Sequence, residues 1–419
     1  MNKLKTYKFS NLYEMSSGIS SKPEQFGHGY PFLSFSTVFK SHFLPDELPD
    51  LMDISEKEKE LYSIKEGDIF LTRTSETLDE LGMSCVSVKD YPIASYSGFL
   101  KRLRPTQDNI SYHKFMAFYL RSKLFRQTMN NNAVMTLRAS LNEQIFSYLD
   151  LILPPFNEQI KIGDFLFQLN QKIELNNKIN AELEAMAKLI YDYWFVQFDF
   201  PNEEGKPFKS SGGKMVWNEE LKREIPEGWE VGTLLDIATF TNGIACQKFR
   251  PVNNEKYYKV IKIREMSDGF KEDYECVSQN IPEKVIVNNG DVLFSWSATL
   301  EVKIWTGGIG ALNQHIFKIT SNKFPKSFYY FELLRYLQHF KMIAELRKTT
   351  MGHITQDHLK QSRIVIPNIE LIKSLEIKLN PILNKIIKSK EENQKLSELR
   401  DWLLPMLMNG QVKVQEINK

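Results

Sequence analysis

The chain contains an internal repeat at a constant offset of 213 residues, in which Leu141–Tyr193 aligns with Ile354–Met406 without a gap. In both copies a short apolar run ends at a proline, Pro154 in the first and Pro367 in the second. Beyond each proline, apolar residues coincide: Ile162, Leu166, Leu169, Ile173, Leu183, Met186 and Ile190 fall on Leu375, Leu379, Ile382, Ile386, Leu396, Leu399 and Leu403. A repeat of this length indicates two copies of one structural arrangement.

Weaker matches precede the strong one, and they occur in the same order in both halves. SSGIS at residues 16–20 resembles TNGIA at 241–245, and EGDIFLTRTS at 66–75 resembles NGDVLFSWSA at 289–298. YSGFLKRL, which begins at Tyr96, occupies the place of LNQHIFKI, which begins at Leu312. The order of the matches predicts a variable module, a helix, a second variable module and a second helix.

Both strongly repeated segments have the spacing of coiled-coil helices. Positions 162, 166, 169, 173, 176, 180, 183, 187 and 190 alternate steps of four and three, and adding 213 gives the same rhythm. Polar residues interrupt both seams midway, namely Asn176, Asn180, Ser389 and Asn393. A buried polar residue in the seam fixes the register and the choice of partner helix. The alternative is that these side chains face solvent. A pseudo-two-fold repeat requires the helices to run antiparallel, and aligning their centres places Asn176 opposite Ser389.

Each variable half combines short β-type runs with a later helical stretch. The runs include YPFLSF and KVIKI, separated by Gly, Pro, Asn and Asp turns. The helical stretches are KFMAFYLRSKLFRQTM and SFYYFELLRYLQHFKMIAEL. The expected fold class is therefore α/β (α+β), with two similar mixed modules separated by two long antiparallel coiled-coil helices.

The expected boundaries follow from these patterns. The segment 199–228 is rich in Pro, Gly, Ser and charged residues and is expected to be a connector without helix or strand. Aromatic residues at its ends, Trp194, Phe195, Phe198, Trp217 and Trp229, indicate that it is docked. The expected parts are a first module at 1–153, a helix at 154–198, the connector, a second module at 229–366, a second helix at 367–410 and a tail at 411–419.

Charge is segregated along the chain, although the net charge is only +2. Between Ser97 and Arg138 there are eight Lys or Arg and one acid, and between Lys303 and Lys348 there are eight and two. Asp46–Asp90 holds thirteen acids and five bases. Clustered cations can neutralise phosphates whatever the net charge is. Solvated helical faces explain the counts equally well.

Several functional classes find no support in the sequence. No apolar run approaches the ~18 residues of a membrane span, and from the first residues we expect no secretory signal. The three cysteines are far apart, which fits a cytoplasmic protein without a zinc site. The LPPF run at Leu153–Phe156 superficially resembles an amino-methyltransferase motif, but leucine cannot accept the hydrogen bond that this chemistry needs. We expect no catalytic, cofactor or metal site.

Residues 151–231 resemble the central conserved region of type I restriction–modification specificity subunits, the HsdS family. The resemblance lies in LILPPFNEQIKI, KIELNNKINAELEAMAKLIYDYWFVQFDFP and KSSGGKMVWNEELKREIPEGWEV. RDWLLPMLMNGQVKV at 400–414 resembles the distal conserved region of the same family. The resemblance implies that each module reads one half of a split double-stranded DNA target, and that the helices space the modules and carry two methyltransferase subunits. The methyltransferase would use S-adenosylmethionine, and restriction and translocase subunits would join the full complex.

Candidate DNA-binding residues follow from the contact chemistry of bases and phosphates. They are Arg73, Thr74, Ser75, Tyr96, Ser97, Lys101, Arg102, Arg138, Ser295, Trp296, Ser297, Asn313, Gln314, His315 and Lys348. Lys101 and Arg102 are expected at the surface, and Arg138 and Lys348 are expected on the DNA backbone. Two alternatives remain open: a self-contained site-specific methyltransferase or nuclease, and a coiled-coil scaffold that binds only protein.

Overall fold

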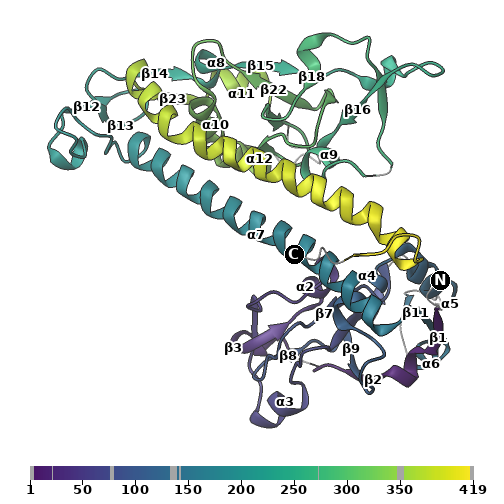
Figure 1. Ribbon diagram of the computed structural model, residues 1–419. Helices are drawn as coiled ribbons and strands as arrows, with labels where there is room; N and C mark the ends of the chain where they lie inside the picture. The colour runs from purple at the N-terminus through teal and green to yellow at the C-terminus, as the bar shows by residue number, and fades with distance from the viewer. Residues whose placement is uncertain are drawn as a thin grey trace. The chain divides into compact units, whose positions relative to one another are not determined.

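The computed structural model describes residues 4–20, 22–75, 80–132, 139–140, 143–271, 273–346 and 353–415 (Figure 1). It forms two compact units, the first made of Met1–Ile173 and Leu396–Lys419 and the second of Glu174–Lys395. The unit boundary crosses two 40-residue helices, α7 (Phe156–Phe195) and α12 (Ile369–Met408). These helices begin and end within three residues of the segments 154–198 and 367–410 that the sequence indicates.

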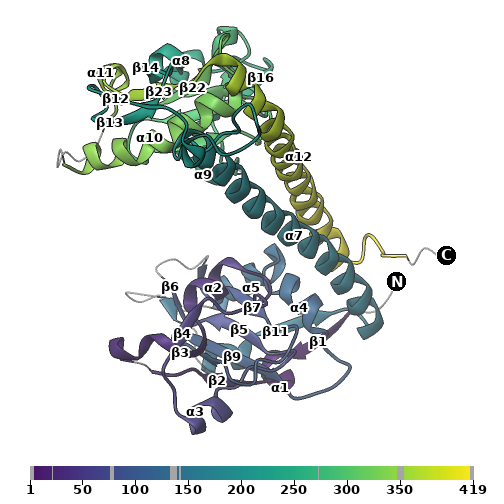
Figure 2. The same cartoon turned by 90° about the vertical axis from the view of Figure 1, so that its left-hand side faces the viewer.

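The first unit contains a mixed α/β module (Figure 2). Its four-stranded sheet has the order β2 (Tyr13–Ser17), β9 (Leu100–Pro105), β5 (Ile69–Thr72) and β7 (Ser84–Val86). A three-stranded sheet has the order β4 (Asp50–Met52), β3 (Phe26–Leu33) and β8 (Ser95–Tyr96). β1 (Lys5–Lys8) pairs with β11 (Asp150–Leu153), and β6 (Thr74–Ser75) pairs with β10 (Ala139–Ser140). The helices are α1 (Phe9–Leu12), α2 (Phe35–Lys40), α3 (Glu56–Leu61), α4 (His113–Tyr119), α5 (Lys123–Asn132) and α6 (Glu143–Tyr148).

The second unit contains a module of the same kind. One four-stranded sheet has the order β15 (Thr239–Asn242), β22 (Ile316–Thr320), β19 (Val292–Ser295) and β20 (Glu301–Ile304). The other has the order β17 (Cys276–Ser278), β16 (Tyr257–Ile261), β21 (Gly310–Leu312) and β18 (Ile286–Val287). β14 (Glu230–Thr233) pairs with β23 (Arg363–Ile366). The helices are α8 (Leu234–Ile237), α9 (Ile263–Asp268), α10 (Lys326–Leu346) and α11 (Gln356–Lys360).

The two modules share the strand order of one four-stranded sheet and of the closing strand pair, so the internal repeat is confirmed. The sheet β2-β9-β5-β7 corresponds to β15-β22-β19-β20, and the closing pair β1-β11 corresponds to β14-β23. Each module also has one parallel pair, β3 with β8 and β16 with β21. β11 and β23, and likewise α7 and α12, begin 213 residues apart, as in the sequence repeat.

Each module is built around its own apolar core, which includes part of a long helix. In the first unit, Ile162 and Leu166 of α7 and Leu407 of α12 pack with the buried aromatic residues of α1 and α4. In the second unit, Tyr191 of α7 donates a hydrogen bond of 2.7 Å to Glu332 of α10, whose side chain is 1% exposed. Burial raises the pKa of the Glu332 carboxyl. The long helices are therefore part of both cores.

Within the second unit, α7 and α12 pack antiparallel, as the fold class predicts. Asn176 contacts Asn393, Glu184 contacts Lys390, and Trp194 lies under the ammonium of Lys378. The partner number falls along α12 as the residue number rises along α7, which only antiparallel helices do. Figure 1 shows the two helices side by side in this unit.

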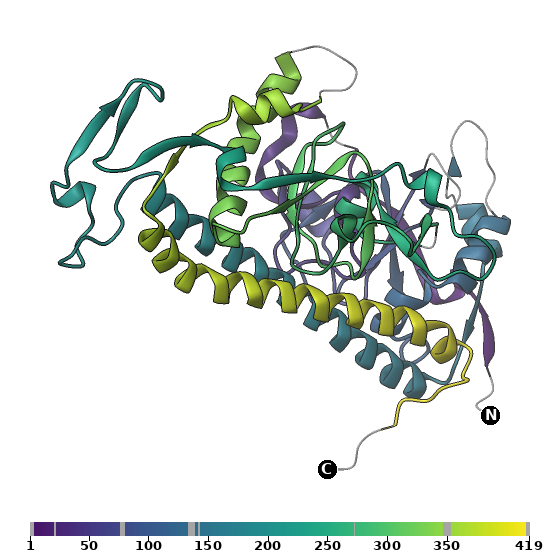
Figure 3. The same ribbon diagram turned by 90° about the horizontal axis from the view of Figure 1, so that it is seen from above.

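The segment 199–228 differs from its prediction, because it contains regular structure. β12 (Met215–Asn218) and β13 (Arg223–Pro226) form an antiparallel hairpin, which Figure 3 shows as an extension from the helices. The Asn218 side chain accepts hydrogen bonds from two backbone N–H groups of the turn, and Lys222 closes it with a φ of 52°. Such a turn depends on one asparagine, and the overall composition of a segment rich in charged residues does not indicate it. Trp194, Phe195 and Phe198 are buried as expected, but Trp217 is 58% exposed.

The stretch KFMAFYLRSKLFRQTM also differs, because it forms two helices, α4 and α5, instead of one. Ser122 causes the break. Its hydroxyl donates to the carbonyl of Tyr119 and accepts from the N–H of Phe125, so it ends one helix and caps the next. The corresponding stretch of the second module is the single helix α10.

Candidate nucleic-acid interface

In each module, separate segments of the chain meet at one point and are joined there by the same set of backbone hydrogen bonds. We call this point the loop crossing. In the first module the N–H groups of Ile19, Ser97 and Arg73 donate to the carbonyls of Tyr96, Leu33 and Phe99 at 2.9, 3.0 and 2.9 Å. In the second module the N–H groups of Ile244, Asn313 and Trp296 donate to those of Leu312, Ile261 and His315 at 3.0, 3.1 and 3.3 Å. Each residue of one set aligns with its counterpart in the sequence repeat or in the parallel strand pairs.

A glycine makes this crossing possible in each module. A Cβ atom on Gly18 would lie 2.3 Å from the carbonyl oxygens of Tyr96 and Ser97. A Cβ atom on Gly243 would lie 2.1 Å from the carbonyl oxygen of Asn313. These glycines are the centres of the SSGIS and TNGIA repeats, so close approach of two backbones explains the residue type.

The GDIF and GDVL turns lie at the start of β5 and β19, the strands that lead to the loop crossing. The carboxylates of Asp68 and Asp291 each accept a 2.8 Å hydrogen bond from the backbone N–H three residues earlier. Asp68 forms an ion pair of 2.6 Å with Arg104 of β9, and Asp291 forms one of 2.8 Å with Lys318 of β22. The turn is thereby tied to the neighbouring strand in both modules.

The side chains on this shared framework differ between the modules, and some of them are exposed. In the first module Ser17 and Arg73 are exposed, Thr74 is half-buried, and Phe99 is 67% exposed. The guanidinium of Arg73 has no partner among the residues that the structure describes. An exposed cation beside an exposed aromatic ring is a combination that contacts DNA bases and backbone.

In the second module the exposed group is an aromatic and amide cluster. The indole N–H of Trp296 donates to the Oδ1 of exposed Asn242 at 3.3 Å. The imidazole centroids of His315 and His353 lie 5.6 and 5.7 Å from the Trp296 ring, and Gln314 contacts His315 at 3.2 Å. Trp296, Gln314 and His315 are half-buried, and the Nδ1 of His315 is buried.

Other candidates prove to be internal, and the surface position expected for Lys101 was wrong. These side chains are at most 9% exposed: Tyr96, Ser97, Lys101, Ser295, Ser297 and Asn313. Lys101 donates to the Oγ of Ser17 at 2.7 Å, and the Ser295 hydroxyl donates to the carbonyl of Thr299 at 2.7 Å. Burial does not alternate along these strands, because all of β19 is buried and Leu100 and Lys101 are both buried in β9. The period-two rule for a half-buried strand therefore does not predict which of these side chains is exposed.

Arg102 is half-buried, and its side chain binds backbone carbonyls of the first module. It donates to the carbonyl oxygens of Ser63 at 3.0 Å and Leu61 at 3.5 Å, and its guanidinium lies 5.4 Å from the Tyr96 ring centre. Arg138 and Lys348 lie outside the described residues, and for Ser75 the structure describes only the backbone pairing with Ala139.

The basic clusters in the sequence are largely engaged inside the modules. Arg121 donates to the carbonyls of Ser84, Val38 and Ser41, and burial lowers its pKa to about 10. Lys303 donates to the carbonyls of Met266 and Ser267. Arg104, Lys114, Lys318 and Arg335 form ion pairs with acids of their own unit. A run of cations along the chain is therefore a poor guide to the interface.

Sequence reasoning missed Phe99, Asn242 and His353. Phe99 aligns with His315 in the repeat, and Asn242 lies next to the glycine of TNGIA. The repeat itself was therefore the signal that could have found both. His353 precedes Ile354, whose N–H donates to the Trp296 carbonyl at 3.0 Å. Nothing in the sequence indicates that bond.

The polar residues of the helical seam lie in the second unit. The Nδ2 of Asn176 donates at 2.8 Å to Oδ1 of Asn393 and at 2.8 Å to Oε2 of Glu392, and Asn393 donates to Asn177 at 2.8 Å. Asn176 therefore pairs one turn away from Ser389, its expected partner. Asn180 and Ser389 are also buried, so the solvent-facing alternative is wrong for all four residues.

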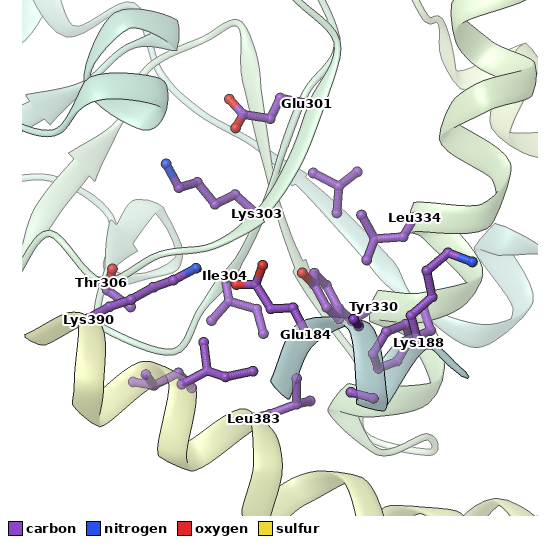
Figure 4. A pocket seen from close by; sticks show the side chains of 16 residues that line it. Glu184, Lys188, Glu301, Lys303, Ile304, Thr306, Tyr330, Leu334, Leu383 and Lys390 are labelled. Carbon is purple, nitrogen blue, oxygen red and sulfur yellow. Dashed lines mark hydrogen bonds and ion pairs between the residues drawn. The ribbon is translucent and has the colours of Figure 1, made fainter. Parts of the chain in front are cut away.

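A cavity of about 440 Å³ lies within the second unit, lined by residues of α7, β20, α10 and α12 (Figure 4). Its charged residues have partners, since Glu184 pairs with Lys390 at 2.7 Å and Glu301 accepts from Ser267 at 2.9 Å. Its walls are apolar residues such as Ile304 and Leu383. The cavity therefore presents no nucleophile with an adjacent base.

Two further features bear on function classes. Within the described residues, no three His, Cys, Asp or Glu side chains gather closely enough to hold a metal ion. Among the same residues no helix combines the length and apolar composition of a membrane span. Leu153 ends β11 and Phe156 begins α7, so the LPPF run is a strand-to-helix junction, as its place in the repeat indicates.

Comparisons with known proteins agree on one family. The model of the type I restriction modification DNA specificity domain matches residues 5–185 and 226–398. The chain is 24% identical over 379 residues to the type I restriction enzyme MjaIX specificity subunit of Methanocaldococcus jannaschii, covering 86% of this chain and 81% of that protein. It is 24% identical over 480 aligned positions to the HindI specificity subunit of Haemophilus influenzae, covering 97% and 99%.

Solved structures show the same fold. The crystal structure of the type I restriction-modification system S subunit from M. genitalium superimposes with a TM-score of 0.60 at 12% identity, and covers 97% of this chain and 96% of that one. Two matches of the family model cover both modules and most of both long helices. This chain therefore belongs to the family of type I restriction–modification DNA specificity proteins.

Proposed function

We propose that this chain is the non-catalytic DNA-recognition subunit of a type I restriction–modification complex. It binds a bipartite, asymmetric target in double-stranded DNA, with one module on each half-site. The observation that carries the proposal is the duplicated loop crossing, in which one backbone framework presents different exposed side chains in each module. A common framework with different contact residues is what reading two different base sequences requires.

Catalysis belongs to partner subunits in this proposal. Two adenine methyltransferase subunits supply the reaction and bind S-adenosylmethionine, and restriction and translocase subunits join the full complex. The chain binds no cofactor and acts in the cytoplasm. A self-contained methyltransferase or nuclease and a protein-only scaffold are the alternatives that the first experiment separates.

The chain should confer methylation without performing it. Purified alone, it should bind duplex DNA and incorporate no methyl label. With its methyltransferase subunit and S-adenosylmethionine, adenines in one split sequence should become methylated, as sequencing of modified bases would detect. Label incorporated by the isolated chain would support the enzyme alternative. Full methylation in a complex lacking this chain would support the scaffold alternative.

Helix α7 has a second apolar face that the second unit does not cover. Leu175, Ile179, Met186, Leu189 and Tyr193 are between 37% and 66% exposed. At 3.6 residues per turn they fall within about 80° of one another, and about 110° from the buried seam residues Asn176, Asn180 and Ala187. Their spacing of three, four and seven residues is that of a coiled-coil seam.

A methyltransferase subunit is the proposed occupant of this face, through an amphipathic helix. The heptad spacing favours a helix over a flat surface, because knobs from a partner helix fit such a seam. Exposed Glu182 lies within the seam, so the partner helix should present a lysine or arginine opposite it. An apolar stripe of this length on a soluble helix marks an interaction site.

Replacing Met186 and Leu189 by glutamate should weaken assembly with the methyltransferase about 100-fold, because two central contacts become unpaired charges. Both side chains are exposed, so the urea unfolding curve should stay close to wild type. The matched control replaces the exposed apolar residues Val252 and Ile309 of the second module by glutamate. Titration calorimetry without DNA measures the affinity. Equal affinities for both double variants would exclude this face of α7.

A further inference from the structure

The duplicated crossing contains three pairs of equivalent positions with accessible side chains. Ser17 aligns with Asn242, Arg73 with Trp296, and Phe99 with His315. We define the first trio as Ser17, Arg73 and Phe99, and the second trio as Asn242, Trp296 and His315. Each trio joins three separate chain segments at one point, on β2 or β15, after β5 or β19, and before β9 or β22.

Backbone bonds fix the trios, so their positions do not depend on side-chain identity. The link between the second and third members is a backbone hydrogen bond in both modules, from Arg73 to Phe99 and from Trp296 to His315. The link to the first member is the glycine that follows it, because its missing Cβ allows the two backbones to touch. Side chains can therefore change while the platform stays the same.

The residues around the trios are conserved in role between the modules, whereas the trios differ in chemistry. The aspartate turn, an ion pair from that aspartate to a cation of the neighbouring strand, and the glycine recur. The trios contain a hydroxyl, a guanidinium and a phenyl ring in one module, and an amide, an indole and an imidazole in the other. The recurring residues therefore build the module, whereas the trios are the positions at which the two modules differ.

We propose that these trios determine base specificity, with Arg73 contacting a guanine in one half-site and Asn242 an adenine in the other. This assignment rests on the proposed function. Arginine offers two parallel donors that match the O6 and N7 of guanine, and an asparagine amide matches the N6 and N7 of adenine. Trp296 orients the Asn242 amide by donating to its oxygen, and that oxygen keeps a second lone pair for the base. Phe99 supplies an apolar edge beside Arg73, and His315 supplies an imidazole, whose Nε2 contacts Gln314, beside the Trp296 ring.

The experiment uses the full chain with its methyltransferase subunits in cells that lack other adenine methylation, and sequencing of modified bases gives the methylated motif. Arg73→Ala should relax one base pair of one half-site, with discrimination there falling about 5- to 150-fold, and leave the other half-site unchanged. Asn242→Ala should do the same in the other half-site only. The controls are Lys57→Ala and Asn254→Ala, which remove exposed side chains of similar chemistry from the same modules.

Each result bears on the assignment. A motif that loses one specified position in the expected half-site supports it, and it also shows that the variant folds. A uniform loss of methylation with an unchanged motif overturns it, because that is the behaviour of a phosphate contact. An unchanged motif at full activity also overturns it while leaving the proposed function intact. A wild-type complex that methylates no split site contradicts the proposed function itself.

Discussion

Replacing Lys101 by glutamate is expected to unfold the first module instead of merely weakening its binding to DNA. Lys101 lies in β9, is 8% exposed, and donates to Ser17 of the neighbouring strand β2 at 2.7 Å. A carboxylate at this position would be buried in place of a cation, with the single hydrogen bond that the Ser17 hydroxyl can donate as the contact seen at this site. Burying an uncompensated charge typically costs about 3–5 kcal/mol, a large part of the stability of a domain.

Urea unfolding, with hydrogen exchange of the first-module amides, measures this loss. Lys57→Glu is the matched control, because Lys57 is an exposed lysine of α3 in the same module and its reversal should change stability by less than about 0.5 kcal/mol. A Lys101→Glu variant with wild-type stability and reduced DNA affinity would restore the view that Lys101 is a surface contact. The same reasoning applies to Arg102, whose guanidinium binds two backbone carbonyls.

Lys101 also illustrates what the sequence could and could not predict about the interface. A cation count treats every lysine and arginine as solvated, but Lys101, Arg104 and Arg121 are held by partners inside the first unit. Whether a strand residue points inward depends on register, and a shift of one residue reverses it. Composition therefore identified the basic segments without locating accessible cations.

The repeat was more informative than composition, because it reflects topology. An offset of 213 residues predicted that β11 and β23 and the two long helices would correspond, and they do. The weaker upstream matches of the repeat, which do not keep this offset, also align Phe99 with His315, and this places an exposed aromatic ring where residue preferences alone suggested none. Long-range backbone bonds, such as that from Arg73 to Phe99, then explain why these positions coincide.

Register of the helical pair was predictable only to within one turn. Periodicity specifies which residues face the seam, but the choice among registers four residues apart depends on hydrogen bonds and end contacts. Asn176 pairs with Asn393 because both amides then find partners, including Glu392. Aligning the helix centres gave Ser389 instead, since centre alignment ignores the aromatic packing of Tyr191 and Trp194 in the second unit.

Inserting one heptad into both long helices should change the recognised spacer without changing the half-site bases. Each helix enters both units, so seven added residues lengthen each connection by about 10 Å. That length corresponds to about three base pairs, or about a third of a turn of DNA. Insertion between Glu184 and Ala185 and between Lys388 and Ser389 keeps Asn176 with Asn393 on one side and leaves the apolar seam residues Ala187 and Leu383 on the other.

A heptad is the required unit, because it restores the a and d positions, whereas three or five residues would rotate the seam away from its partner. Sequencing of methylated adenines in cells with the insertion variant should give the same two half-sites with a longer spacer. Insertion into α7 alone is the control. The two helices then differ in length, so the contact of Asn176 with Asn393 and the apolar seam contacts cannot form together, and stability and methylation should be lost. A doubly inserted variant that folds and methylates the original spacer would show that helix length does not set the distance between half-sites.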